Sequence, residues 1–171
     1  ASVFIGLNDL SAVGRIATQS GVVDQNIIAA GIFTVLAQYS AGVQAIADTG
    51  VGTVVLNLLP PISFFPTSAE LVAVAGAEAV DAPSDAVNQG IQQIALGLQA
   101  SGVNVKVIDF GGLANAIQDD PAGFGFLSLS NIVDDPGPNA VLRIDDIPIE
   151  QVGFIDSVHF TAALHEIFGA Y

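Results

Sequence analysis

Short β-branched apolar runs alternate with long helical patterns along this chain, and this alternation limits the folds open to it. Thr53–Leu59 reads TVVLNLL between polar or proline neighbours and has the composition of a buried strand. Asn104–Phe110 (NVKVIDF) and Ser2–Ile5 have the same character. Strands separated by helices are typical of a parallel sheet with helices on both faces. We therefore predict a three-layer α/β/α fold, and a single domain over residues 1–171.

Helices are predicted where apolar residues recur every three or four positions. In the longest, Asp24 is suited to cap the first turn and Gly50 to end the last. Residues 6–9 have the composition of a turn, and residues 123–148 are predicted to be irregular. The predicted helices are Asp24–Asp48, Asp81–Ser101, Gly111–Asp119 and Thr161–Gly169.

Composition excludes several classes of function. The chain is 51% hydrophobic, but polar residues interrupt every apolar run before it reaches the roughly 20 residues of a membrane span. The chain has three basic and seventeen acidic residues, which gives a net charge of −14. This charge repels a phosphate backbone, so nucleic acid is not an expected partner. The absence of cysteine excludes thiol chemistry and is compatible with a secreted or cell-surface bacterial protein.

Two short motifs carry candidate chemistry. Asp156 and His159 form D-x-x-H, in which the carboxylate can fix one imidazole nitrogen while the other accepts a proton from a nucleophile. A surface or capping pair has the same spacing. Asn8 follows the first predicted strand, where its amide can donate to an oxyanion or bond its own backbone in a turn. For each motif taken alone, the structural interpretation is favoured.

Taken in order, four stretches resemble the GDSL/SGNH hydrolases: VFIGLND, TVVLNLLPPISFFP, VIDFGGLANAIQDDPAGFGF and FIDSVHFTAALH. The resemblance implies an SGNH-hydrolase-like, flavodoxin-like fold and a carboxylic-ester hydrolase, that is, an esterase or lipase acting on an ester or lipid. Asn8 then matches the oxyanion-hole asparagine, with Gly6 in the same block. His159 matches the catalytic base, and Asp156 the acid that orients it. The resemblance implies no metal and no organic cofactor.

The chain departs from the family pattern in two places. Phe160 stands where the family usually has proline. No serine follows Gly-Asp, so the nucleophile block of the family and a further oxyanion glycine have no match. We therefore expect the C-terminal two-thirds of the enzyme, with the serine outside this chain and the natural N-terminus upstream of Ala1. The chain alone is expected to be inactive, and to self-associate or bind a complementing segment. The alternative is a non-catalytic binding or structural protein with a degenerate SGNH-like fold.

Other residues carry weaker signals. Phe64, Phe65 and Phe160 have the apolar character of an acyl pocket, although core packing explains the first two equally well. His165 is interpreted as structural. Five acids in one irregular stretch offer oxygen ligands of the kind that Ca²⁺ prefers, but without the spacing of a calcium loop, so a solvated acidic loop is favoured. These acids are Asp134, Asp135, Asp145, Asp146 and Glu150.

Overall fold

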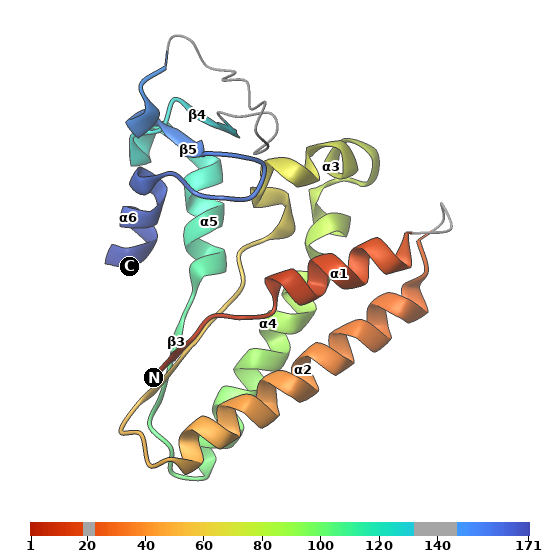
Figure 1. The fold of residues 1–171 in the computed structure, drawn as a ribbon, viewed down its shortest axis with the longest axis vertical. Coiled ribbons are helices and arrows are strands. Elements are labelled where there is room, and N and C mark those ends of the chain that lie inside the picture. The colour runs from red at the N-terminus through yellow and green to blue at the C-terminus, as the bar shows by residue number, and fades with distance from the viewer. Residues whose placement is uncertain (19–22, 132–146) are drawn as a thin grey trace, which may run out of the picture. The chain divides into compact units, whose positions relative to one another are not determined.

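The structure is a computed structural model that describes residues 1–18, 23–131 and 147–171 (Figure 1). By its internal contacts the chain divides into two compact units. The first comprises Ala1–Leu59 and Asp81–Phe110, and the second comprises Pro60–Val80 and Gly111–Tyr171. Each unit holds a parallel sheet of its own, so we describe the units one at a time.

The sheet of the first unit has three strands in the order β1-β2-β3, all parallel. In the central strand, Val55 pairs with Ser2 on one side and with Lys106 on the other. The strands are shorter than the apolar runs that predicted them, and β1 ends before Phe4 and Ile5, which are exposed. Their bounds are Ser2–Val3 for β1, Val54–Asn57 for β2 and Val105–Ile108 for β3.

Helix α2 (Gln25–Asp48) begins and ends where the sequence predicts. The carboxylate of Asp24 accepts a hydrogen bond of 2.9 Å from the backbone N–H of Asn26, which makes it the N-cap. Gly50 has φ 78°, a conformation that costs glycine little and other residues more. The cap and the stop are therefore local properties of the sequence.

Helix α1 (Leu7–Ala17) contradicts the prediction of a turn at residues 6–9. Gly6 has φ 116° and redirects the chain from β1 into the helix. Leu10 and Ala17 are buried on one face, so tertiary packing outweighs the turn-like composition of the first residues. Helix α1 lies beside α2 (Figure 1), and a side chain at Gly31 would clash with Val13.

Helix α4 (Ala77–Ala100) begins four residues before the predicted start at Asp81. The sequence there reads Asp-Ala-Pro-Ser-Asp, which resembles a helix start because proline is favoured in a first turn. Pro83 instead lies inside the helix, where it lacks the N–H of a regular turn. The hydroxyl of Ser84 donates to the carbonyl of Asp81 at this point.

The core of the first unit lies between its sheet and its helices. Val54 and Leu56 of β2 are fully buried, and α2 and α4 cover them with further apolar side chains. Each buried valine, leucine or isoleucine side chain among them contributes about 1.5–3 kcal/mol. The contributing helix residues include Val35, Tyr39 and Val43 of α2 and Val87, Ile91, Ala95 and Leu98 of α4.

Tyr39 carries a buried hydroxyl that has no hydrogen-bond partner among the residues that the structure describes. Burial raises the pKa of its phenol to about 12, so the group stays neutral. Because an unpaired buried hydroxyl is costly, we expect Tyr39→Phe to raise the free energy of unfolding by about 1 kcal/mol. Urea unfolding at pH 7 measures this. A loss of stability of the same size would show that the hydroxyl is bonded in solution.

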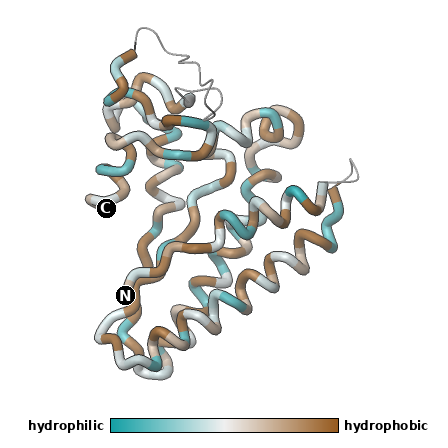
Figure 2. Tube along the Cα trace, viewed as in Figure 1, coloured by the Kyte–Doolittle hydropathy of each residue, from teal (hydrophilic) through white to brown (hydrophobic). Residues whose placement is uncertain are grey.

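Helix α2 is the one helix among the described residues that is long and apolar enough to cross a membrane, judged by length and composition alone. Figure 2 shows hydrophobic residues along much of its length. This is weak evidence for a membrane span, because core helices pass the same test. Val35, Tyr39 and Val43 are core residues in this structure.

The second unit contains short helices and a two-stranded parallel sheet. In this sheet Ser128 of β4 pairs with Val152 of β5. Neither strand was predicted from the sequence. Strand β4 lies within residues 123–148, which were predicted to be irregular. Residues 132–146 of that range lie outside the described residues. The bounds are Ala69–Ala75 for α3, Phe110–Asp119 for α5, Ser128–Asn131 for β4, Val152–Phe154 for β5 and Ala162–Ala170 for α6. Single turns of 3₁₀ helix are η1 (Ile62–Phe64), η2 (Pro66–Ser68), η3 (Ala122–Phe124) and η4 (Ile149–Gln151).

The predicted fold class is confirmed: the chain is α/β, with a parallel sheet flanked by helices, consistent with a three-layer α/β/α fold. In the first unit every neighbouring pair of strands is parallel, and a helix lies between consecutive strands in the sequence. Parallel neighbours require such crossover connections.

Candidate active site

A closed loop between β5 and α6 carries the Asp156–His159 motif. At its base, the N–H of Ile155 donates to the carbonyl of His159 at 2.8 Å. Next to this bond, the N–H of Thr161 donates to the carbonyl of Gly153 at 2.9 Å. These bonds hold the two ends of the loop together, so the three residues between Ile155 and His159 keep a fixed turn.

Thr161 fixes the exit of this loop through its side chain as well. Its hydroxyl donates to the carbonyl of Val152 at 2.7 Å and accepts from the N–H of Leu164 at 3.3 Å. Thr161 is therefore the N-cap of α6 and a link back to β5. The sequence predicts a helix that begins at Thr161. It does not predict the hydrogen bond from Thr161 to β5, because no local pattern marks that strand.

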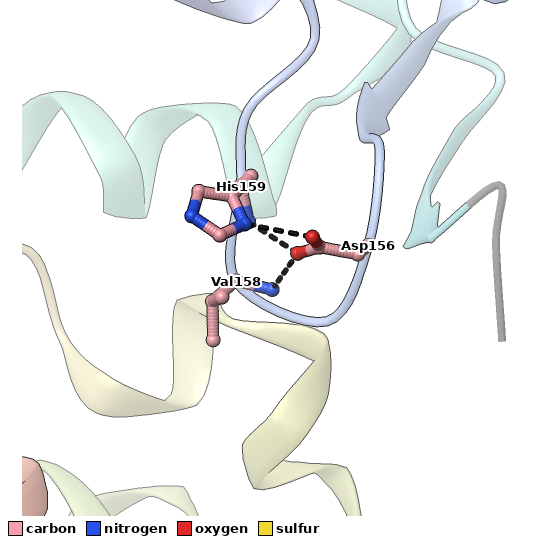
Figure 3. A network of polar contacts seen from close by, with 3 residues as sticks. All are labelled: Asp156, Val158 and His159. Carbon is pink, nitrogen blue, oxygen red and sulfur yellow. Dashed lines mark hydrogen bonds and ion pairs between the residues drawn. The ribbon is translucent and has the colours of Figure 1, made fainter. Parts of the chain in front are cut away.

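The carboxylate of Asp156 accepts three hydrogen bonds inside the loop (Figure 3). Its Oδ1 accepts from the backbone N–H groups of Val158, at 2.9 Å, and His159, at 2.8 Å. Its Oδ2 lies 2.7 Å from Nδ1 of the His159 ring. The D-x-x-H spacing thus brings carboxylate and imidazole into contact, and the backbone bonds fix the carboxylate in place.

Burial and hydrogen bonding act in opposite directions on Asp156. Burial alone raises the pKa of its carboxyl, but the hydrogen bonds from the Val158 N–H, the His159 ring and the His159 N–H together outweigh it. The pKa of Asp156 is therefore lowered from its ordinary value, and the group is a carboxylate at neutral pH. The carboxylate side chain is 7% exposed, whereas the imidazole is 74% exposed.

The contact decides which nitrogen of His159 carries the proton. A carboxylate only accepts hydrogen bonds, so Nδ1 is the protonated nitrogen of the neutral ring. Nε2 is then unprotonated, and it points away from Asp156 (Figure 3). An exposed imidazole with a free Nε2 and a carboxylate behind Nδ1 is the arrangement of a general base.

An aromatic cluster and one backbone bond connect this loop to the 3₁₀ turns η1 and η2. The N–H of Thr67 donates to the carbonyl of Ser157 at 3.0 Å. The ring of Phe65 stacks on Phe160 with centroids 5.9 Å apart, and Phe64 meets Phe160 edge to face at 6.0 Å. Of the three predicted substrate-binding residues, Phe64 and Phe65 are buried and Phe160 is half-buried.

Asn8 belongs to the first unit. It lies in the first turn of α1 rather than directly after a strand, and its side chain is exposed. A surface hollow of about 280 Å³ includes Asn8 and is otherwise lined by residues 4–7, Asp9 and Leu59. The exposed amide is free to donate a hydrogen bond to a group in this hollow. That Asn8 acts together with His159 of the second unit remains a prediction.

Among the residues that the structure describes, the remaining candidates do not gather into a second site. His165 is exposed on α6, with its ring edge to face with Phe160 at 5.4 Å. Glu150 is exposed in η4, whereas Asp134, Asp135, Asp145 and Asp146 lie outside the described residues. Within the described ranges, no group of three or more histidine and acidic side chains is placed to hold a metal ion.

The family model described as GDSL-like Lipase/Acylhydrolase matches residues 1–171, the whole chain. The search of curated proteins finds no match.

Proposed function

The chain belongs to the GDSL-like lipase and acylhydrolase family, and we propose that it supplies the Asp–His pair and an oxyanion-stabilising asparagine to a carboxylic-ester hydrolase. The family acts on ester and lipid substrates. The observation that carries the proposal is the 2.7 Å contact between Asp156 Oδ2 and His159 Nδ1, made by a buried carboxylate and an exposed ring.

In the proposed reaction His159 moves a proton twice in each half-reaction. Its Nε2 accepts the proton of a serine hydroxyl while the serine oxygen attacks the ester carbonyl carbon. The protonated ring then gives that proton to the departing alcohol, which leaves an acyl-serine. The same Nε2 then takes a proton from water while the water oxygen attacks the acyl carbon. As the bond between that carbon and the serine oxygen breaks, the ring returns the proton to the serine oxygen and the acid leaves. Asp156 stays ionised throughout and stabilises the imidazolium that forms in each step.

The nucleophile of this reaction comes from outside residues 1–171 in our proposal. The family's serine follows Gly-Asp, and the printed sequence contains no Gly-Asp pair. Ser157 is nearest to the histidine in sequence, but it belongs to the turn that holds Asp156, and its neighbours are Asp156 and Val158. Ser2, Ser11 and Ser63 likewise lack the motif.

Asn8 is proposed to donate its side-chain amide to the oxyanion of the tetrahedral intermediate. In the protein with a Gly-Asp-Ser segment present, we expect Asn8→Ala to lower kcat by about 10²–10³-fold, because one preorganised donor is worth this much in an oxyanion hole. Steady-state kinetics with p-nitrophenyl butyrate measures the effect. Asn115→Ala, an exposed asparagine on α5, is the matched control and should leave kcat unchanged. An Asn8→Ala enzyme with normal kcat would remove Asn8 from the site.

A further inference from the structure

The second unit contains a larger hollow, of about 620 Å³, whose walls come from four parts of the chain. Phe64, Phe65 and Pro66 of the η1–η2 segment form one wall, and Ala69, Val72 and Ala73 of α3 form another. Ser63, Gln118 of α5, and Leu129 and Ser130 of β4 complete the lining. The volume lies within the range of sites that hold small molecules.

The lining of this hollow is uncharged, although the chain carries seventeen acids. Its polar groups are also partly engaged with one another, because Gln118 donates from Nε2 to the carbonyl of Ser63 at 3.2 Å. The apolar side chains of α3 that face it lie three and four positions apart, as one face of a helix requires. A neutral, apolar group is therefore the ligand that this surface favours.

Two contacts join the hollow to the loop that carries His159. Phe65 lines the hollow and stacks on Phe160, the residue after His159. Thr67 follows the wall residue Pro66 and donates its N–H to Ser157, inside the Asp156–His159 turn. The wall of the hollow and the turn that holds the imidazole are thus packed as parts of the same unit.

We infer that this hollow binds the hydrocarbon chain of the ester's acyl group and sets its preferred length, an inference that rests on the proposed function for the identity of the ligand. The helix α3 face made by Ala69, Val72 and Ala73 is then a specificity-determining surface. Small side chains on this face leave room for the hydrocarbon chain of the acyl group. Larger side chains would shorten the acyl group that the enzyme prefers.

Binding is tested on the 171-residue chain with 1-butanol, 1-hexanol and 1-octanol, which are neutral probes of hydrocarbon binding. In ¹⁵N NMR titrations we expect the amide signals of Ala69, Val72 and Ala73 to shift. The Kd should fall by about two- to fourfold for each added methylene, because each buried methylene contributes a constant free energy. Binding without dependence on chain length, or shifts confined to other residues, would overturn the inference.

Two variants fill the hollow and one serves as a control on the same helix. Ala73→Trp and Ala69→Trp should each weaken 1-octanol binding by about tenfold or more. Val74 is 88% exposed and lies outside the lining, so Val74→Trp should bind 1-octanol as the unsubstituted chain does. Both alanines are exposed, so the variants should fold, which their NMR spectra check. Unchanged affinity in both filled variants contradicts the inference.

Hydrolysis by the protein with the Gly-Asp-Ser segment separates this inference from the proposed function. Ala73→Trp should lower kcat/KM for p-nitrophenyl octanoate about tenfold more than it lowers kcat/KM for the acetate ester. Equal losses on both esters, or on neither, contradict the acyl-chain assignment while His159-dependent hydrolysis still supports the function. Alcohol binding without His159-dependent hydrolysis would instead refute the proposed function and leave an apolar binding site.

Discussion

His159→Ala should lower kcat for p-nitrophenyl butyrate by about 10⁴–10⁶-fold in a form of the protein that carries a Gly-Asp-Ser segment ahead of Ala1. Without Nε2, no group accepts the proton of the serine hydroxyl or returns it to the leaving alcohol. The members of a triad act as a unit, so losing the base costs nearly as much as losing the nucleophile. Single-turnover measurements would show the loss in the acylation step itself.

The other histidine of the chain provides the control for this experiment. His165 is also exposed and also contacts Phe160. Within residues 1–18, 23–131 and 147–171, no carboxylate bonds to its ring, whereas Asp156 bonds to the ring of His159. His165→Ala should therefore keep kcat within about twofold. The isolated 171-residue chain should hydrolyse the same ester no faster than free imidazole at equal concentration. Fast, His159-dependent turnover by the isolated chain would reveal a nucleophile within it. No activity after adding the segment would favour the non-catalytic alternative.

The sequence predicts the strands and helix α2 of the first unit because their signals are local. The β-branched run around Val54–Asn57, the cap at Asp24 and the stop at Gly50 each fix the conformation of a few neighbouring residues. Parallel pairing then follows from the helix between consecutive strands. None of these steps requires knowledge of what packs against the element.

The elements that the sequence misses depend on tertiary contacts. Helix α1 begins with residues of turn-like composition, and its stability comes from burying Leu10 and Ala17. The strands β4 and β5 are four and three residues long and gain their pairing only from each other. Such short elements have weak intrinsic preferences, which tertiary context overrides.

The candidate site also contains one local contact that the sequence predicts and several long-range contacts that it does not. The D-x-x-H spacing predicts the contact of Asp156 with His159 because four consecutive residues suffice to form the turn. The support from Thr161 and Thr67 joins the turn to β5 and to η2, and no pattern in the sequence marks those partners. The hollow beside α3 is likewise built from segments up to 67 positions apart, between Ser63 and Ser130.

Asp156→Asn should lower kcat by about 10⁴-fold in the protein with the Gly-Asp-Ser segment, the loss that the same exchange causes in a catalytic triad. The amide of asparagine can donate to Nδ1 of His159, which places the ring proton on Nε2 and leaves the base unable to accept one. KM should change little, because Asp156 is buried behind the ring. Glu166→Gln, an exposed acid on α6, is the matched control.

The same substitution should change how stability depends on pH, which a role confined to catalysis would not do. The pKa of Asp156 is lower in the folded chain than its ordinary value of about 3.9. Its carboxylate therefore stabilises the fold fully above that value, and the stabilisation is lost as the pH falls through the folded-state pKa. We expect Asp156→Asn to reduce the free energy of unfolding at pH 7 by about 1–2 kcal/mol. The deficit should shrink below about pH 4, measured by urea unfolding at a series of pH values. A deficit that grows on acidification would mean that the carboxylate is not held by the bonds to Val158 and His159.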